Sequence, residues 1–282
     1  MALHQIQSMI RPSTLKEAWK AKAEQCESAR FLGGGIDVVL YTPSSVTTLI
    51  DLAGLGLSDV REDVSGLMIG GTTTMTEAIE SAAVKAYAGA FLIRVLKEVA
   101  SPLQRNAATF GGTLGSAHPW SDVIPALLVL DAELDVYDGS DRAIGLEAYL
   151  EGRGNDVAPI ICAIRLPGEL RPARGAFATF TRTAFDVGLL NVACVGSIDG
   201  GAWKDVRIAV GGTPGLAARL RGVEKGLVGS AADDALIEEA SAAAADAIDA
   251  RDDLRASGEY RRILARTLVG RCLAEISEGS TG

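Results

Sequence analysis

The chain has 282 residues, of which 48% are hydrophobic and 22% charged, as in an ordinary globular protein rather than a disordered or fibrous one. The formal net charge is -9 and no basic run is present, which argues against a nucleic-acid partner. The sequence has neither a secretory leader pattern nor a long uncharged apolar window, so we expect a cytoplasmic protein without a membrane span. The length predicts one large or two modest domains.

Cysteine and histidine usage argues against a metal site in this chain. The four cysteines are scattered singly without a C-x-x-C pair, and only two histidines could assist them. A zinc site or an iron–sulfur cluster needs several such ligands at short spacing. We therefore interpret all four cysteines as small buried apolar side chains, namely Cys26, Cys162, Cys194 and Cys272.

The N-terminal part predicts a helix followed by strands and a glycine turn. Thr14–Glu17 has the T-x-x-E form of a capping box, and apolar residues follow it at helical spacing. Arg30–Leu32 then runs as a strand into Gly33–Asp37, and Thr48–Leu52 is a second short buried strand.

The next segment repeats the order of strand, glycines and hydroxyls. Val60–Asp63 and Gly66–Ile69 read as two strands around a turn, and Gly70–Thr74 leads into a helix. Tyr87–Val99 has helical spacing of its apolar residues, and Ser101-Pro102 ends that helix.

A third glycine turn, Thr109–Ser116, follows. Beyond it we predict a helix over Ser121–Leu130 and strands over Glu133–Tyr137 and Pro159–Leu166. The polar, turn-rich stretch Gly168–Gly175 is the predicted domain boundary.

The remainder predicts an α+β unit of about a hundred residues, a size at which a core can stand alone. Strands are expected near residues 176–182, 189–199 and 206–210, followed by an alanine-rich helix within 231–250 and a last helix that includes residues 260–272. No residue pattern in this part indicates chemistry.

The three glycine turns are candidate anion sites. Backbone N–H groups freed by glycines at a helix start can hold a phosphate without any lysine, and several such turns together favour a diphosphate. Neither a P-loop nor a G-x-G-x-x-G between strand and helix is present. Taken singly, each turn also fits a structural hairpin or a helix cap, so the residues alone indicate an α+β protein with an anionic ligand.

Three segments together resemble the FAD-binding medium subunit of molybdenum hydroxylases of the carbon monoxide dehydrogenase and xanthine dehydrogenase type. Leu32–Asp37 is similar to that family's L-A-G-G-T-D loop, and Ile69–Thr74 is similar to I-G-A-x-T-T. Ala100–Leu114 is similar to A-S-x-Q-I-R-N-x-A-T-I-G-G-N-L, and the likeness continues to Ala132.

The resemblance extends to the C-terminal part through four motifs: Arg182–Asp186, Asn191–Ala193, Gly211–Pro214 and Asp253–Arg262. It implies an α+β fold with a two-lobed FAD-binding domain (PCMH-type) over 1–173, a small lobe of about 1–57 and a larger lobe of about 58–173. A C-terminal α+β domain over 174–282, as in the carbon monoxide dehydrogenase flavoprotein, would complete the chain.

The resemblance also implies which residues hold FAD. Gly33–Asp37 and Thr109–Thr113 would wrap the diphosphate, and Gly70–Thr73 would support the first of these loops. Ser116 and Asp122 would face the ribityl chain and the flavin, and Leu166 would pack near the ring, whereas Asp122 could instead be a carboxylate placed by the helix dipole. The candidate cofactor-binding residues are Leu32, Gly33, Gly34, Gly35, Ile36, Asp37, Gly70, Thr72, Thr73, Thr109, Gly111, Gly112, Thr113, Ser116, Asp122 and Leu166.

Four positions depart from the family pattern. Ile36 stands in place of a threonine and Thr113 in place of an asparagine, which weakens single contacts rather than the site. His118 and Trp120 stand where small or acidic residues are common, and we expect His118 to line the turn.

The resemblance implies partners and a function. A large molybdopterin-binding subunit and a small subunit with 2Fe-2S clusters would join this chain, with a dimer of heterotrimers expected. This chain would pass electrons from the clusters through FAD to an external acceptor, with no catalytic residue and no metal of its own. Two alternatives stay open: a free-standing flavin oxidase of the same superfamily, and a flavin-free assembly or scaffold protein.

Overall fold

The computed structural model describes residues 4–154, 158–183 and 186–279. These residues form three β-sheets, whose strand orders are β1-β3-β2, β4-β5-β8-β6-β7 and β12-β11-β10-β9. The chain forms two compact units. The first comprises Met1–Ala83, Ser101–Ser116 and Ala132–Leu166, and the second comprises Val84–Ala100, Ala117–Asp131 and Pro167–Gly282.

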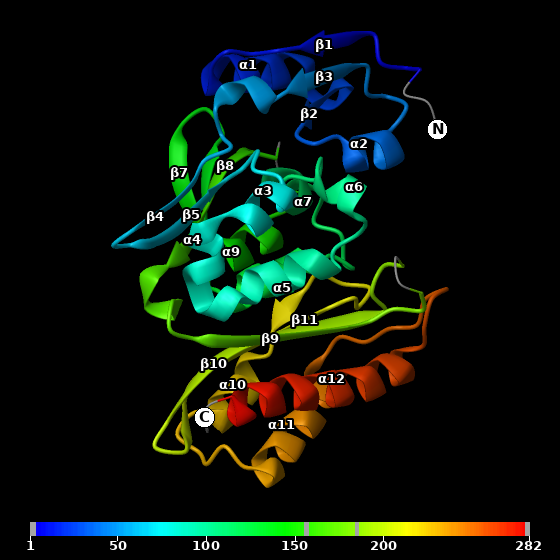
Figure 1. The fold of residues 1–282 in the computed structure, drawn as a ribbon. Helices are drawn as coiled ribbons and strands as arrows, with labels where there is room; N and C mark the ends of the chain where they lie inside the picture. Colours follow the sequence, from blue (N-terminus) through cyan, green and yellow to red (C-terminus); the bar gives the residue numbers. More distant parts are fainter. Residues whose placement is uncertain (1–3, 155–157, 184–185, 280–282) are drawn as a thin grey trace. The chain divides into compact units, whose positions relative to one another are not determined.

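The first sheet is parallel and lies in the first unit (Figure 1). Its strands are β1 (Ser8–Ile10), β2 (Ala29–Leu32) and β3 (Thr48–Asp51), accompanied by α1 (Leu15–Gln25), η1 (Cys26–Ser28), α2 (Ile36–Tyr41) and η2 (Ala53–Leu55). The Thr14 hydroxyl caps α1 by accepting the N–H of Glu17, and Ala18 packs against Ala29 and Ile50 in a buried cluster. The predicted helix and both predicted strands are therefore confirmed.

The second sheet, also in the first unit, has antiparallel pairs at both ends. Its strands are β4 (Val60–Asp63), β5 (Gly66–Gly70), β6 (Glu133–Tyr137), β7 (Asp141–Gly145) and β8 (Ile160–Pro167). The helices of this unit are α3 (Met75–Glu80), α6 (Pro102–Arg105), α7 (Phe110–Ser116) and α9 (Leu146–Glu151), and α4 (Ala82–Ala86) begins in this unit and ends in the second. The expectation of a turn throughout Thr109–Ser116 is wrong, because the segment from Phe110 onward is helical.

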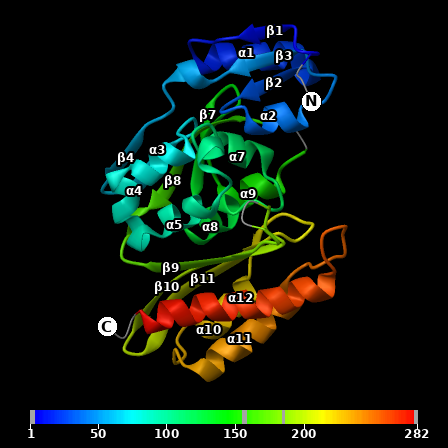
Figure 2. The same ribbon diagram turned by 45° about the vertical axis from the view of Figure 1, so that its right-hand side comes forward.

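The third sheet is antiparallel and lies in the second unit. Figures 1 and 2 show α11 and α12 on one face of this sheet and α5 and α8 on the other. Its elements are η3 (Tyr87–Ala90), α5 (Phe91–Glu98), α8 (Val123–Val129), η4 (Gly168–Leu170), β9 (Arg174–Phe180), β10 (Leu190–Asp199), β11 (Ala202–Gly211), β12 (Ala218–Arg219), α10 (Arg221–Leu227), α11 (Asp234–Ala247) and α12 (Gly258–Glu278).

The cysteine prediction is confirmed for Cys194 and Cys272, which are buried, and wrong for Cys26, which is exposed. Cys26 is the C-cap of α1 with φ 47°, so it lies at an exposed helix end rather than on its buried face. Cys162 is partly exposed. Ala184 and Phe185 of the Arg182–Asp186 motif lie outside the described residues.

Candidate functional site

The first glycine loop joins β2 to α2 in the first unit. Gly35 has φ 82°, a left-handed conformation in which only glycine is unstrained. A Cβ on Gly33 would lie 2.6 Å from the Thr109 hydroxyl oxygen, and a Cβ on Gly34 would overlap the Ala107 carbonyl oxygen. The loop therefore lies directly against residues 107–109, and only glycines permit this approach.

Four consecutive backbone donors of this loop are unused. Within residues 4–154, 158–183 and 186–279, no acceptor receives the N–H groups of Gly33, Gly34, Gly35 or Ile36. Backbone donors at a helix start carry partial positive charge and favour an anionic ligand. The arrangement can bind phosphoryl oxygens without a basic side chain.

The N–H groups at the start of α7 are engaged within the chain, unlike those of the first loop. Phe110 and Gly111 donate to the carbonyls of Thr73 (3.1 Å) and Gly71 (2.7 Å), and Gly112 donates to the Thr109 hydroxyl oxygen (3.1 Å). Thr109 is 5% exposed, and its hydroxyl hydrogen is left to donate to a ligand. The segment 109–112 thus offers a ligand the Thr109 hydroxyl and the uncovered backbone of Gly111 and Gly112, because its N–H groups at 110, 111 and 112 already have acceptors.

Gly70–Thr73 was predicted to support the loop Gly33–Asp37, but it accepts hydrogen bonds from the start of α7. A Cβ on Gly70 would overlap the Leu57 carbonyl oxygen, and one on Gly71 would overlap that of Ile161. Because this segment accepts the N–H groups of residues 110 and 111, it supports the turn at residues 109–112 directly. Among the described residues, the buried hydroxyl oxygens of Thr72 and Thr73 have no hydrogen-bond partner.

Arg153 fixes the C-terminal end of α7 and was not predicted from the sequence. Its guanidinium donates to the carbonyl oxygens of Leu114 (2.9 Å), Gly115 (2.8 Å) and Ser116 (3.1 Å). Cations at the last carbonyls of a helix are favourable. No local pattern could have found Arg153, because it lies 37 residues from Ser116 in the chain.

Asp122 belongs to the second compact unit and is partly buried at the N-terminal end of α8. Burial raises the pKa of this carboxyl to about 6, the hydrogen bond from Asn191 (2.9 Å) opposes the rise, and the charge of Glu98 adds to it. Asp122 is the N-cap residue of α8 and its side chain makes no capping hydrogen bond, so its position agrees with the alternative of a carboxylate placed by the helix dipole. Leu166, at the end of the first unit, is 1% exposed.

No group of three or more histidine, cysteine or carboxylate side chains that could hold a metal ion occurs in the described part of the chain. None of the helices described is long and apolar enough to cross a membrane.

Comparison with known proteins places this geometry in a family. Residues 4–169 match the family described as "FAD binding domain in molybdopterin dehydrogenase". Residues 175–276 match the "CO dehydrogenase flavoprotein C-terminal domain". The chain therefore belongs to the family of FAD-binding domains of molybdopterin dehydrogenases, and it is an oxidoreductase subunit of that class.

Curated relatives align over nearly their whole length. The nicotine 6-hydroxylase medium subunit of Paenarthrobacter nicotinovorans is 28% identical, covering 88% of this chain and 90% of the relative. The carbon monoxide dehydrogenase medium chain of Hydrogenophaga pseudoflava is 26% identical, covering 93% of this chain and 94% of the relative. The xanthine dehydrogenase FAD-binding subunit of Escherichia coli O157:H7 is 25% identical, covering 98% of this chain and 97% of the relative.

Solved structures share the fold. Quinoline 2-oxidoreductase from Pseudomonas putida 86 superimposes with a TM-score of 0.88 at 22% identity, covering 98% of both chains. Carbon monoxide dehydrogenase from Hydrogenophaga pseudoflava superimposes with a TM-score of 0.90 at 23% identity, covering 96% of this chain and 97% of the other. The predicted α+β fold of the family is thereby confirmed.

Proposed function

We propose that this chain binds FAD, with the diphosphate on the N–H groups of Gly33–Ile36. The supporting observation is the row of four backbone donors without an acceptor in the described chain. They belong to a loop in which a Cβ on Gly33 or Gly34 would collide with residues 107–109. A diphosphate is the part of FAD that such donors recognise. Ile36 would contribute only its backbone N–H. Having isoleucine where the family pattern has threonine therefore removes a side-chain hydroxyl but none of the four backbone donors.

Other residues would complete the cofactor site. The Thr109 hydroxyl and the Gly111–Gly112 surface would meet the phosphates from the side opposite the first loop. The role predicted for Asp122 toward the ribityl chain concerns a residue of the second compact unit and stays a prediction. The remaining proposed positions are Leu32, Asp37, Gly70, Thr72, Thr73, Thr113, Ser116 and Leu166.

We further propose that the chain is the electron-transfer subunit of a heteromeric molybdenum hydroxylase. Bound FAD would supply the electron carrier between 2Fe-2S clusters of a small subunit and an external acceptor, and a large subunit would carry the molybdopterin cofactor. Relatives named as medium chains support a multisubunit complex. A dimer of heterotrimers and a cytoplasmic location belong to the same proposal.

The two family matches support the proposed functional domains, 1–173 with lobes of about 1–57 and 58–173, and 174–282. The domain 1–173 would bind the cofactor. Its residues 117–131 would pack with the C-terminal domain 174–282, because both belong to the second compact unit.

The test is flavin uptake followed by reconstitution. The purified chain should bind FAD with the absorbance bands of a flavoprotein, and these bands should bleach only when reduced iron–sulfur and molybdopterin partners are added. A colourless chain that takes up no FAD at saturating supply favours the scaffold alternative. A yellow chain that an organic substrate bleaches without partners favours the free-standing oxidase.

A further inference from the structure

Two cysteines of the second compact unit lie on elements that pack together. Cys194 is on β10 and Cys272 is on α12, and both are buried in one apolar cluster. The Cys272 thiol is a hydrogen-bonding neighbour of the Cys194 thiol, and it also donates to the Val192 carbonyl oxygen (4.0 Å). Both cysteines are free thiols in this structure. Their sulfur atoms are therefore adjacent and unlinked.

The faces of β10 and α12 bring these side chains together. Val192 and Cys194 share one face of β10, because side chains two residues apart in a strand point the same way. On α12, Cys272 follows Arg261 by 11 residues, about three turns, so both lie on the same side of the helix. Both are 1% exposed, so this side of α12 is the one that packs against the sheet.

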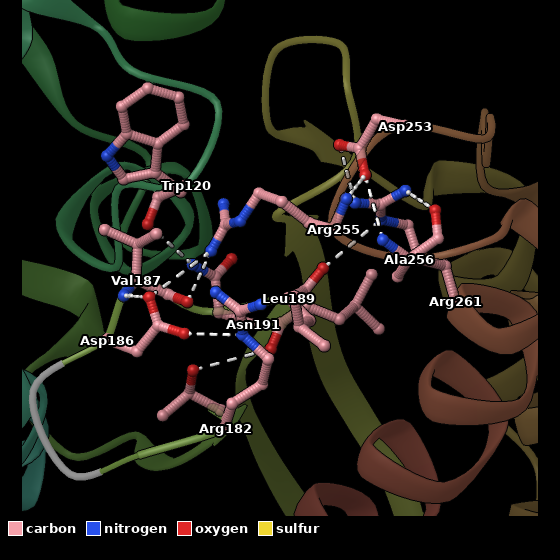
Figure 3. Close-up of polar contacts among 12 residues, drawn as sticks. Trp120, Arg182, Asp186, Val187, Leu189, Asn191, Asp253, Arg255, Ala256 and Arg261 are labelled. Carbon is pink, nitrogen blue, oxygen red and sulfur yellow. Dashed lines mark hydrogen bonds and ion pairs between the residues drawn. The ribbon is translucent and has the colours of Figure 1, made fainter.

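The register of α12 on β10 is set at the start of the helix, as Figure 3 shows. Arg261 donates to the carbonyl oxygen of Leu189 (3.4 Å), the residue directly before β10. From Leu189 to Cys194 the extended chain covers about 16 Å. From Arg261 to Cys272 the helix covers about the same length. The matching lengths bring the two cysteines to the same level along β10.

The far end of α12 is fixed as well. Glu275 pairs with Arg94 of α5 (2.6 Å), and the Ser277 hydroxyl donates to the Ala232 carbonyl oxygen (3.1 Å). Cys272 lies between these contacts and the one made by Arg261. A cross-link at Cys272 therefore needs no shift of the helix along the strand.

The surroundings keep Cys194 protonated in the folded chain. Burial and the neighbouring Cys272 thiol raise the pKa of Cys194 well above its usual range. Because thiol–disulfide exchange proceeds through the thiolate, the packed pair is slow to react. The pair is reactive before α12 docks on β10, that is, while the chain folds.

We propose that Cys194 and Cys272 are a disulfide-forming pair, which ties α12 to β10 when the chain folds in the presence of a low-molecular-weight disulfide. In a reducing compartment the pair stays as two thiols. The pair is a covalent lock on the core of the second compact unit, and it is independent of the proposed FAD binding.

The reaction exchanges one disulfide for another. The thiolate of one cysteine attacks a sulfur of oxidised glutathione, which forms a mixed disulfide and releases one glutathione thiolate. The thiolate of the second cysteine then attacks the protein sulfur of this mixed disulfide and releases the second glutathione. The protein pair loses two electrons and two protons, and the two glutathione molecules take them up.

The test is refolding of the full chain from urea with oxidised glutathione, followed by peptide mass mapping and thermal unfolding, all without FAD. We expect two of the four thiols to disappear and Cys194 to be linked to Cys272. The linked chain should unfold about 5–10 °C higher than the reduced chain, because the cross-link restricts the unfolded state, and dithiothreitol should remove this gain. Cys272→Ala should show neither the link nor the gain.

The exposed Cys26 supplies a matched control. Cys26→Ser should keep both the link and the gain in unfolding temperature, and it decides the question if Cys272→Ala folds poorly. Four free thiols after refolding, glutathione adducts on Cys194 and Cys272 in place of the link, or a link to Cys26 or Cys162 would overturn the inference. A link that leaves the unfolding temperature unchanged would overturn the lock.

Discussion

Gly34→Ala tests the contact between the two loops that frame the proposed diphosphate site. The added methyl overlaps the Ala107 carbonyl oxygen and also comes 3.2 Å from the Ala108 nitrogen. The loop must shift by more than about 1 Å, enough to break hydrogen bonds whose usual length is about 2.9 Å. If two of the four donors are lost at about 1.5 kcal/mol each, FAD binding weakens by about 3 kcal/mol, or roughly a hundredfold.

The assay is FAD titration by flavin fluorescence, with thermal unfolding measured in parallel. Gly115→Ala is the matched control, since a Cβ there meets nothing within 4 Å and the residue lies in α7. That control should gain up to about 1 kcal/mol of stability from helix propensity and keep its FAD affinity. A folded Gly34→Ala variant that binds FAD as the wild type does would refute the reasoning.

Three further changes probe the rest of the chain. Arg153→Gln removes the guanidinium from the end of α7 and should cost about 1–2 kcal/mol in urea unfolding, with Arg153→Lys retaining part of it. Glu224→Gln breaks a buried pair with Arg219 (2.8 Å, both side chains 8% exposed) and should cost about 3 kcal/mol by the same measurement; an unchanged midpoint would contradict the assigned pair. Burial acts to raise the pKa of Asp253, but Arg261 and two backbone N–H groups overcome it and hold the pKa at about 2, so this stabilisation is present above pH about 4 and lost as pH falls toward 2. Unfolding at pH 3 and 7 should therefore differ less in Asp253→Asn than in the wild type.

Local patterns were sufficient for most elements of the fold. The hydroxyl caps at Thr14 and Thr74 and the apolar runs of β3 and β10 act within a few residues, so the sequence shows them directly. The short helix α7 was missed because two adjacent glycines favour a turn locally. Hydrogen bonds from the N–H groups of residues 110 and 111 to the carbonyl oxygens of residues 73 and 71 override that preference.

The glycine loops could be predicted as an anion site because free backbone donors depend on local composition. Which backbone N–H groups stay without an acceptor could not be predicted, because residues 110 and 111 donate to a segment about 40 residues away in the chain. The same reason hides the hydrogen bonds of Arg153 and of Asn191, whose partners lie 37 to 71 residues away along the chain. Asp122 was predicted as part of the site and a strand was predicted over residues 189–199, but the hydrogen bond from Asn191 on that strand to Asp122 was not predicted.

Backbone amide exchange of residues 33–36, measured with and without saturating FAD, tests the central claim most directly. Because these N–H groups have no acceptor in the described chain, they should exchange fast in the free protein and become strongly protected when the diphosphate binds. The amides of residues 110–112, bonded already, should change little. FAD uptake without protection at 33–36 would contradict the account.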